Sequence, residues 1–251
     1  MSTSTTDTST TTSTPRFTLH RAADRGPTTL GWLDSRHSFS FGRYYNPNMM
    51  GFRSLRVIND DRIAPGGGFA EHPHDNMEIV SYVVQGGLAH KDSLGNGSTI
   101  RPGDIQRMTA GTGIRHSEFN PSETEPGRFL QIWILPSAEG LTPDYEEKST
   151  GVHDRPGRLT TIVSPAGSEH GVKINQDVSI DAGVFEAGQS AVRPFASDRF
   201  GWIQVVRGDL ELTVDRESVT IGEGDGVELS RGASIEIRAT SEAEVLIFDL
   251  A

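Results

Sequence analysis

The residues most able to do chemistry stand in two short pairs, His72 with His74 and His116 with Glu118. The members of each pair are two positions apart, and in a β-strand the side chains of residues i and i+2 point to the same face. Two neighbouring strands could therefore direct three imidazoles and one carboxylate toward one point. Imidazole and carboxylate ligands suit Fe(II), Mn, Ni, Cu or Zn rather than thiolate chemistry. The spacing predicts a divalent metal site built from these four residues.

The segments around both pairs are typical of strands and tight turns. Residues 79–84 form a β-branched and aromatic run after the first pair, and residues 131–135 form a second apolar run. Glycine-rich stretches at 66–68 and 110–113 allow the backbone to turn sharply beside each pair. No stretch of useful length has helical periodicity. These elements predict a β-barrel around the metal site.

Other polar and aromatic residues near the pairs have more than one interpretation. Glu78 stands four residues after His74, so it could be a ligand, a partner of a ligand or a satisfied barrel residue. The remaining histidines are expected to be surface or hydrogen-bonded residues; those weighed are His37, His90, His153 and His170. Four apolar side chains are candidates for a pocket wall, with ordinary core as the alternative: Phe41, Phe52, Met108 and Phe119.

Composition excludes several classes of protein. The chain has 251 residues, enough to bury one large or two modest cores. It contains no cysteine, which excludes disulfides, thiolate metal sites and cysteine nucleophiles and is compatible with the cytoplasmic location that we expect. No apolar run approaches the ~20 residues that span a bilayer, so no membrane association is expected. The net charge of −11 argues against direct binding of nucleic acid.

An internal repeat divides the chain. Residues 83–88 align with residues 205–210, and Gly103-Asp104 aligns with Gly224-Asp225 at nearly the same offset. The same offset carries His72 onto Pro194 and His74 onto Ala196. We therefore expect a metal-binding barrel over residues 16–140 and a second barrel without metal ligands over residues 141–251.

The two ends of this division carry further expectations. Residues 1–15 are almost all serine and threonine, and they lack the basic and apolar parts of a secretory signal, so a disordered tail is expected there. The second barrel is expected to pack against the first and shield it, with an interaction surface or a vestigial pocket as the alternative. Arg193, Asp198 and Arg199 could line such a pocket or lie in a solvated loop.

The motifs together resemble the cupin signature. Its parts here are Gly66, His72, His74 and Glu78, then Pro102-Gly103-Asp104, then Gly113 and His116. The spacing from Glu78 to Gly86 is one residue longer than usual, and Ser117-Glu118 follows the last histidine. Both departures are similar to the pirin branch of the cupins, in which the glutamate of the His-Ser-Glu segment is the fourth ligand. Residues 37–42, 51–61 and 110–118 also resemble pirins, and the likeness runs from about Phe17 to Leu250.

This resemblance implies a fold and an activity. The fold would be all-β: a bicupin of two double-stranded β-helix (jelly-roll) barrels packed together, with few short helices. The activity would resemble quercetin 2,3-dioxygenase, which cleaves a flavonol such as quercetin with O2 and releases carbon monoxide. His72, His74, His116 and Glu118 would hold one metal, with Glu118 also accepting a proton. Fe(II) is the expected metal, with Ni, Mn, Cu, Co or Zn as alternatives.

A second interpretation places the same ligands in a different class of protein. Some pirins resemble metal- or redox-responsive regulators that bind a transcription factor or a metabolic enzyme, and the acidic charge of this chain would suit a protein partner with a basic face. A purely structural zinc site is disfavoured, because such sites prefer four closed ligands rich in cysteine.

Overall fold

The computed structural model describes residues 16–251, and across them the chain is built almost entirely of strands. The helical content of this part of the chain is one 3-10 turn, η1 (Ala22–Asp24). The expected all-β fold is therefore confirmed. The tail expected at residues 1–15 lies outside the described residues. No described helix is long and apolar enough to cross a membrane.

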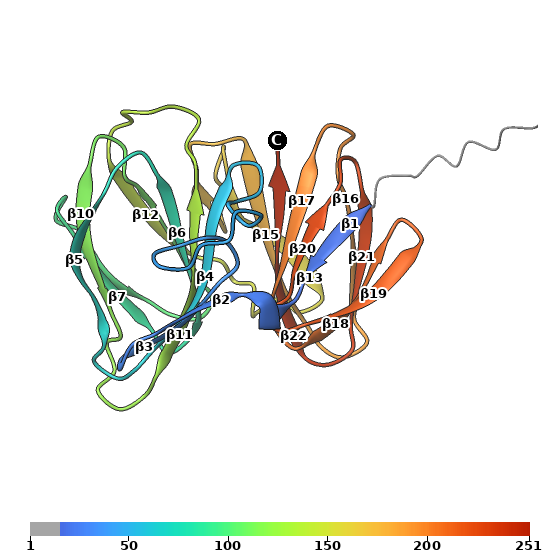
Figure 1. The fold of residues 1–251 in the computed structure, drawn as a ribbon, viewed down its shortest axis with the longest axis horizontal. Coiled ribbons are helices and arrows are strands. Elements are labelled where there is room, and N and C mark those ends of the chain that lie inside the picture. Colours follow the sequence, from blue (N-terminus) through green and yellow to red (C-terminus); the bar gives the residue numbers. More distant parts are fainter. Residues whose placement is uncertain (1–15) are drawn as a thin grey trace, which may run out of the picture.

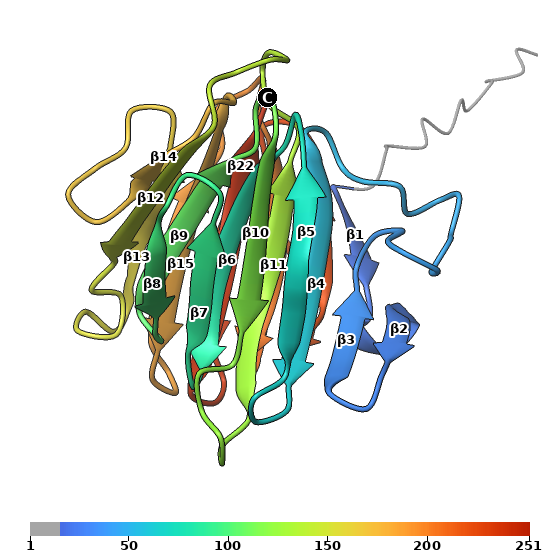
Figure 2. The ribbon, with the colours of Figure 1, turned by 90° about the vertical axis from the view of Figure 1, so that its left-hand side faces the viewer.

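The first barrel consists of a seven-stranded and a four-stranded antiparallel sheet. The seven-stranded sheet has the order β12 (Asp144–Ser149), β9 (Asp104–Thr109), β6 (Glu78–Gln85), β11 (Gly127–Ile134), β4 (Leu55–Ile63), β3 (Leu33–His37) and β2 (Gly26–Thr29). The four-stranded sheet has the order β5 (Gly68–His74), β10 (Ile114–Phe119), β7 (Leu88–Asp92) and β8 (Gly97–Ile100). Figure 2 shows the four-stranded sheet facing the viewer, with the larger sheet behind it.

The second barrel likewise consists of a seven-stranded and a four-stranded sheet. Its larger sheet has the order β1 (Phe17–His20), β20 (Gly226–Leu229), β17 (Phe200–Arg207), β22 (Ala243–Leu250), β15 (Val178–Phe185), β13 (Arg158–Ser164) and β14 (Val172–Lys173). Its smaller sheet has the order β16 (Ser190–Pro194), β21 (Ser234–Ala239), β18 (Asp209–Val214) and β19 (Glu217–Gly222). Strands β6 and β17, which carry the repeated Val-Val segment, occupy the same place in the two larger sheets.

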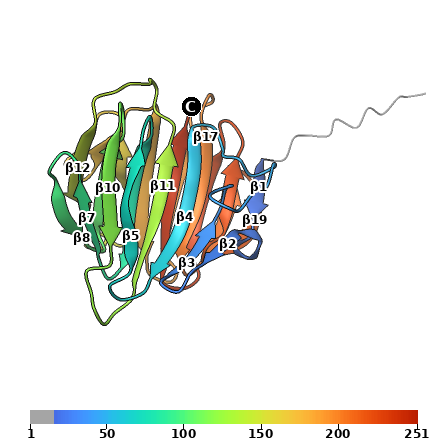
Figure 3. The ribbon, with the colours of Figure 1, turned by 60° about the vertical axis from the view of Figure 1, so that its left-hand side comes forward.

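The two barrels stack with their larger sheets against each other. Figure 1 shows β5, β7 and β10 on the outer left and β16, β18, β19 and β21 on the outer right, with the larger sheets between them, and Figure 3 shows the same order from an oblique side. Apolar side chains from both larger sheets form one shared core, to which Tyr82, Leu130, Trp202 and Phe248 belong. Because burial of apolar surface is the main favourable term in folding, this shared core holds the barrels together.

Sheet membership does not follow the expected division at residue 140. Strand β12 (Asp144–Ser149) pairs with β9 of the first barrel, and β1 (Phe17–His20) pairs with β20 of the second. Each barrel therefore takes an edge strand from chain assigned to the other by sequence. The physical reason is that a buried sheet edge needs partners for its backbone groups, and these flanking segments supply them.

The interiors of the two barrels differ, and this difference positions the site. The second barrel is filled by one apolar cluster from both of its sheets, which includes Ile203, Leu212, Ile235 and Val245. The first barrel has two smaller clusters, one around Leu33, Val83 and Phe129 and another around Ile79, Met108 and Ile114. The interior of the first barrel therefore leaves room for a cavity, whereas apolar side chains fill the interior of the second barrel.

Of the three charged residues considered for a pocket in the second barrel, Arg193 and Arg199 are ion-paired, and Asp198 is exposed in a turn. Arg193 contacts Asp181 and Asp249, each at 2.9 Å, and Arg199 contacts Asp249 at 2.5 Å. Arginine–carboxylate pairs of this kind fix loops and strand ends. Arg193 and Arg199 therefore have a structural role at the end of the second barrel.

Candidate metal centre

Strands β5 and β10 bring the three predicted histidines together. The strands are antiparallel neighbours with His116 opposite His72, and alternation places His74 on the same inner face. The ligand nitrogens of His72, His74 and His116 all lie within 4.8 Å of one another. A register shift follows His116, so the ladder is irregular where Glu118 turns inward.

The nitrogens of these histidines are free to bind a cation. The Nδ1–H of His72 donates to the carbonyl of Ala70 at 2.8 Å, which leaves Nε2 as the acceptor. The Nε2 atoms of His74 and His116 are buried without a hydrogen-bond partner among residues 16–251. Burial, with neighbouring histidine charge, lowers the pKa of His74 to about 4 and that of His116 to about 2. The rings of His74 and His116 are therefore neutral at pH 7, as metal binding requires, so this donor set fits a divalent metal.

Glu118 lies beside His116 with its carboxylate held on both sides. Ser81 donates to one oxygen at 3.2 Å and Gln131 to the other at 2.9 Å. Glu118 shares a second 4.8 Å group with His116 and His90, and burial raises its pKa to about 7. A buried carboxylate beside imidazoles can serve as a ligand or accept a proton.

His90 contacts His116 on the side of its ring away from Nε2, a contact that the sequence does not predict. Its Nε2 lies 3.2 Å from Asp92 Oδ2, and its Nδ1 lies 3.5 Å from Nδ1 of His116. A carboxylate only accepts, so His90 carries its proton on Nε2 and presents Nδ1 as an acceptor. Gln106 Nε2 donates to this Nδ1 at 3.3 Å, and the Nδ1–H of His116 shares it at 3.5 Å, which keeps Nε2 of His116 unprotonated. The i, i+2 spacing of His90 and Asp92 on β7 was the available signal.

Asp92→Asn is expected to weaken metal binding by about 10–100-fold, the usual effect of an outer-shell change. The amide would face His90 with an N–H, reverse the tautomer of both rings and place a proton on the metal-facing nitrogen of His116. Metal titration followed by calorimetry measures this affinity. Asp104→Asn is the matched control, because Asp104 also accepts a turn N–H, from Arg101, but does not contact a histidine. Equal affinity in both variants would contradict the tautomer argument.

Glu78 lies on the opposite face of its sheet from the histidines. It accepts hydrogen bonds from Thr109 at 3.2 Å and from the Asn175 backbone at 3.2 Å, where the two barrels meet. The chain leaves the strand between β5 and β6, with Asn76 at a positive φ of 45°. That break removes the strand alternation which would have placed Glu78 beside His74. Of its three interpretations, the satisfied barrel residue is the one observed.

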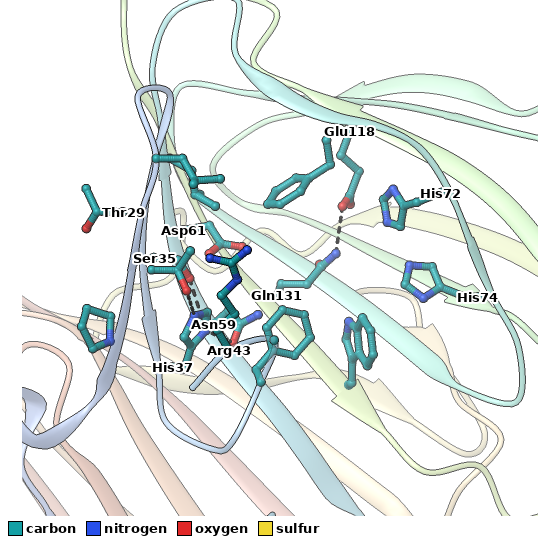
Figure 4. A pocket seen from close by; sticks show the side chains of 18 residues that line it. Thr29, Ser35, His37, Arg43, Asn59, Asp61, His72, His74, Glu118 and Gln131 are labelled. Carbon is teal, nitrogen blue, oxygen red and sulfur yellow. Dashed lines mark hydrogen bonds between the residues drawn. The ribbon is translucent and has the colours of Figure 1, made fainter. Parts of the chain in front are cut away.

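A cavity of about 710 Å³ opens beside the histidines. Phe41, Phe69 and Trp133 contribute aromatic walls, and His74 packs edge-on against Trp133. Figure 4 shows His72, His74 and Glu118 on one side of this cavity. Of the four pocket-wall candidates, Phe41 lines it. The other three lie elsewhere: Met108 in the core, Phe52 against Trp202 and Phe119 partly exposed.

A row of polar side chains crosses the floor of the cavity. Cross-strand neighbours Ser81, Gln131, Asn59 and His37 stand in register on β6, β11, β4 and β3. The one hydroxyl proton of Ser81 is shared between Glu118 and Gln131, whose Oε1 lies 2.8 Å from Ser81 Oγ, and Asn59 Oδ1 lies 2.7 Å from His37 Nδ1. The interior of the first barrel is therefore polar from Glu118 across to His37.

Comparisons with known proteins agree along the length of the chain. The family profile named Pirin matches residues 18–134, and the Quercetinase C-terminal cupin domain matches residues 161–250. The chain is 43% identical over 232 residues to quercetin 2,3-dioxygenase of Escherichia coli O157:H7, covering 92% of this chain and 97% of that protein. It is 38% identical to a pirin-like protein of Caulobacter vibrioides, covering 88% and 94%.

Solved structures agree with the fold and the family. The bacterial pirin YhhW of Escherichia coli, in complex with nickel(II), superposes with a TM-score of 0.86 at 43% identity, covering 93% of this chain and 98% of that one. A quercetin 2,3-dioxygenase from Acinetobacter baumannii shares the fold at 21% identity and a TM-score of 0.74, covering 92% and 85%. The two stacked jelly-roll barrels thus form a bicupin, and the chain belongs to the pirin family.

Proposed function

We propose that the protein is a metal-dependent dioxygenase that cleaves a flavonol such as quercetin, with His72, His74, His116 and Glu118 binding one divalent metal. One observation carries this proposal: three histidine nitrogens converge within 4.8 Å beside a large cavity lined by His72 and His74, and the Nε2 atoms of His74 and His116 have no hydrogen-bond partner among residues 16–251. Relatives that are named quercetin 2,3-dioxygenase support the substrate class.

The residues of this chain would prepare the substrate for oxidation. A bound metal would act as a Lewis acid and supply the redox chemistry toward O2. Phe41 and Trp133 pack edge-to-face with their ring centroids 5.3 Å apart, and together they would form an apolar wall against which a planar ring packs with water excluded. Glu118, held by Ser81 and Gln131, would accept the proton of the substrate hydroxyl.

The donor set supports a metal of intermediate softness, between the hard cations that prefer oxygen ligands and the soft cations that prefer sulfur. Three imidazoles and a carboxylate suit Fe(II) and Ni(II) alike, and a related pirin is known in complex with nickel. We therefore propose Fe(II), with Ni as the first alternative and Mn, Cu, Co or Zn after it. The absence of cysteine supports a cytoplasmic setting for the reaction.

Metal analysis of the purified protein, followed by oxygen uptake and quercetin absorbance on the same sample, tests the function. We expect about one metal per chain, with oxygen consumed as the flavonol absorbance decays. One bound metal without turnover of any flavonol would contradict the dioxygenase and favour a metal-responsive binding protein. Protein without stoichiometric metal after reconstitution would contradict the metal site itself.

A further inference from the structure

The cavity has a second polar wall that the metal centre does not use. Its side chains come from β3 and β4, and each is at most 3% exposed: Ser35, His37, Asn59 and Asp61. Figure 4 shows them on the side of the cavity away from His72 and His74. Strand alternation aims all four inward, with Ser35 opposite Asp61 and His37 opposite Asn59.

The hydrogen-bonding groups of His37 have partners, one of which is Asn59, whereas the carboxyl group of Asp61 is only partly hydrogen-bonded. His37 contacts Thr28 Oγ1 at 2.8 Å and Asn59 at 2.7 Å, so both of its ring nitrogens have partners. Asp61 accepts a hydrogen bond from Ser35, and no second donor to its carboxyl is found within residues 16–251. A carboxylate has about four lone-pair sites. Asp61 therefore lines the cavity with acceptor capacity left over.

Retaining this carboxyl costs stability. Burial raises the pKa of Asp61 to about 7, so its ionised form is disfavoured in the folded protein relative to the unfolded chain. A buried polar group without full hydrogen bonding is destabilising. An incompletely bonded buried group needs an explanation, and a ligand that completes its hydrogen bonds provides one.

The second barrel shows that the fold itself does not need Asp61 and Ser35. The repeat places Val83 and Val205 at equivalent positions. Val83 pairs with Phe129, which pairs on its other side with Asp61, and Val205 pairs with Val245, which pairs on its other side with Gly183. Asp61 of the first barrel therefore corresponds to Gly183 of the second. Ser35 corresponds in the same way to Leu159. Side chains of Leu159 and Phe185 fill the space beside Gly183. The filled barrel is apolar where the open barrel carries a carboxyl and a hydroxyl.

We propose that Asp61 and Ser35 form a second recognition site, which binds a hydroxyl group on the end of the substrate remote from the metal. Asp61 accepts a hydrogen bond from that hydroxyl, and the aromatic walls hold the ring between the two ends. The substrate class is then a multi-ring phenol with hydroxyl groups at both ends. This inference rests on the proposed function, since it assumes an aromatic substrate in this cavity.

Anaerobic calorimetry on the metal-loaded protein tests the site without turnover. The probes are quercetin, which has two hydroxyls on its outer ring, and galangin, which has none. We expect the wild-type protein to bind quercetin about tenfold or more tightly than galangin, the usual effect of a hydrogen bond to a charged group. Asp61→Leu should bring the two dissociation constants within about twofold, and Ser35→Ala should reduce their ratio in the same direction.

Thr29→Val is the matched control, because Thr29 is an exposed hydroxyl on the rim of the same cavity. It should keep the wild-type ratio. An unchanged ratio in folded Asp61→Leu, or the same collapse in Thr29→Val, would overturn the site. Wild-type protein that turns over both flavonols and binds them equally would overturn this inference alone. Metal-loaded wild type that binds neither flavonol would overturn the proposed function with it.

Thermal melting at pH 8 separates recognition from a structural role. Asp61 is ionised at that pH, so removing a buried and incompletely paired carboxylate should leave the melting temperature of Asp61→Leu equal to or above that of the wild type. A structural carboxylate would behave in the opposite way. A loss of several degrees, together with an unchanged flavonol ratio, would assign Asp61 to folding and overturn the proposal.

Discussion

His116→Ala is expected to abolish stoichiometric metal binding and, with it, flavonol turnover. His116 supplies a buried Nε2 that has no hydrogen-bond partner in the described part of the chain, at a point where the nitrogens of His72 and His74 also converge. Loss of a direct ligand should weaken metal affinity by more than about 100-fold, beyond the 10–100-fold of an outer-shell change. Elemental analysis of the purified variant, beside oxygen uptake, measures both effects.

The control separates loss of metal from loss of fold. His170→Ala removes a histidine from the second barrel, outside both groups of converging ligands, and should retain about one metal per chain. Because a bound ligand stabilises the native state by mass action, a chelator should lower the melting temperature of wild type and of His170→Ala but not that of His116→Ala. Full metal content in folded His116→Ala would remove this residue from the ligand set.

Glu118→Gln is expected to lower turnover by about 100- to 10,000-fold, the range for loss of a general base. The side chains are nearly the same shape, and the amide can accept from Gln131 while its N–H₂ donates to Ser81. The melting temperature of the metal-free protein should therefore change little. Steady-state oxygen uptake under saturating metal, with thermal melting of the same preparation, gives both readouts.

Glu78→Gln is the matched control for this change. Glu78 is also a fully buried carboxylate, but it faces Thr109 and Asn175 where the barrels meet. Its replacement is expected to affect melting and to leave turnover per folded molecule unchanged. If Glu118→Gln kept wild-type turnover, or if Glu78→Gln lost it, the proton-accepting role would pass from Glu118 to another residue.

The strands and their two-fold repetition could be predicted because their signals are local. The β-branched run at 79–84 and the apolar run at 131–135 became β6 and β11, and the Val-Val repeat places β6 and β17 at equivalent positions. Pairing of the flanking strands could not be predicted. Strands β1 and β12 each join the sheet of the other half, and an edge strand carries little information about which open edge it will cover.

The convergence of the histidines could be predicted because i, i+2 spacing on a strand fixes a common face. The same rule failed for Glu78, since it assumes that the strand continues, and the backbone turns at Asn76. His90 is expected to be a surface or hydrogen-bonded residue, and it is hydrogen-bonded to Asp92, but the sequence does not predict its contact with His116. Asp61 carries no signal of its own, because a carboxylate within a strand looks like any solvent-facing residue until the burial of that strand is known.

The sequence by itself determined the fold class, the repeat and the residue types that could bind a metal, because alternation, turn chemistry and ligand spacing act over a few neighbouring residues. The tertiary structure decided which neighbours complete the site. On strands β7 and β10, Asp92 contacts His90, and His90 contacts His116. Asp61 on β4 lines the cavity. These contacts depend on strand register and on which face of a sheet is buried. Both are set by packing between distant segments, which no local pattern encodes.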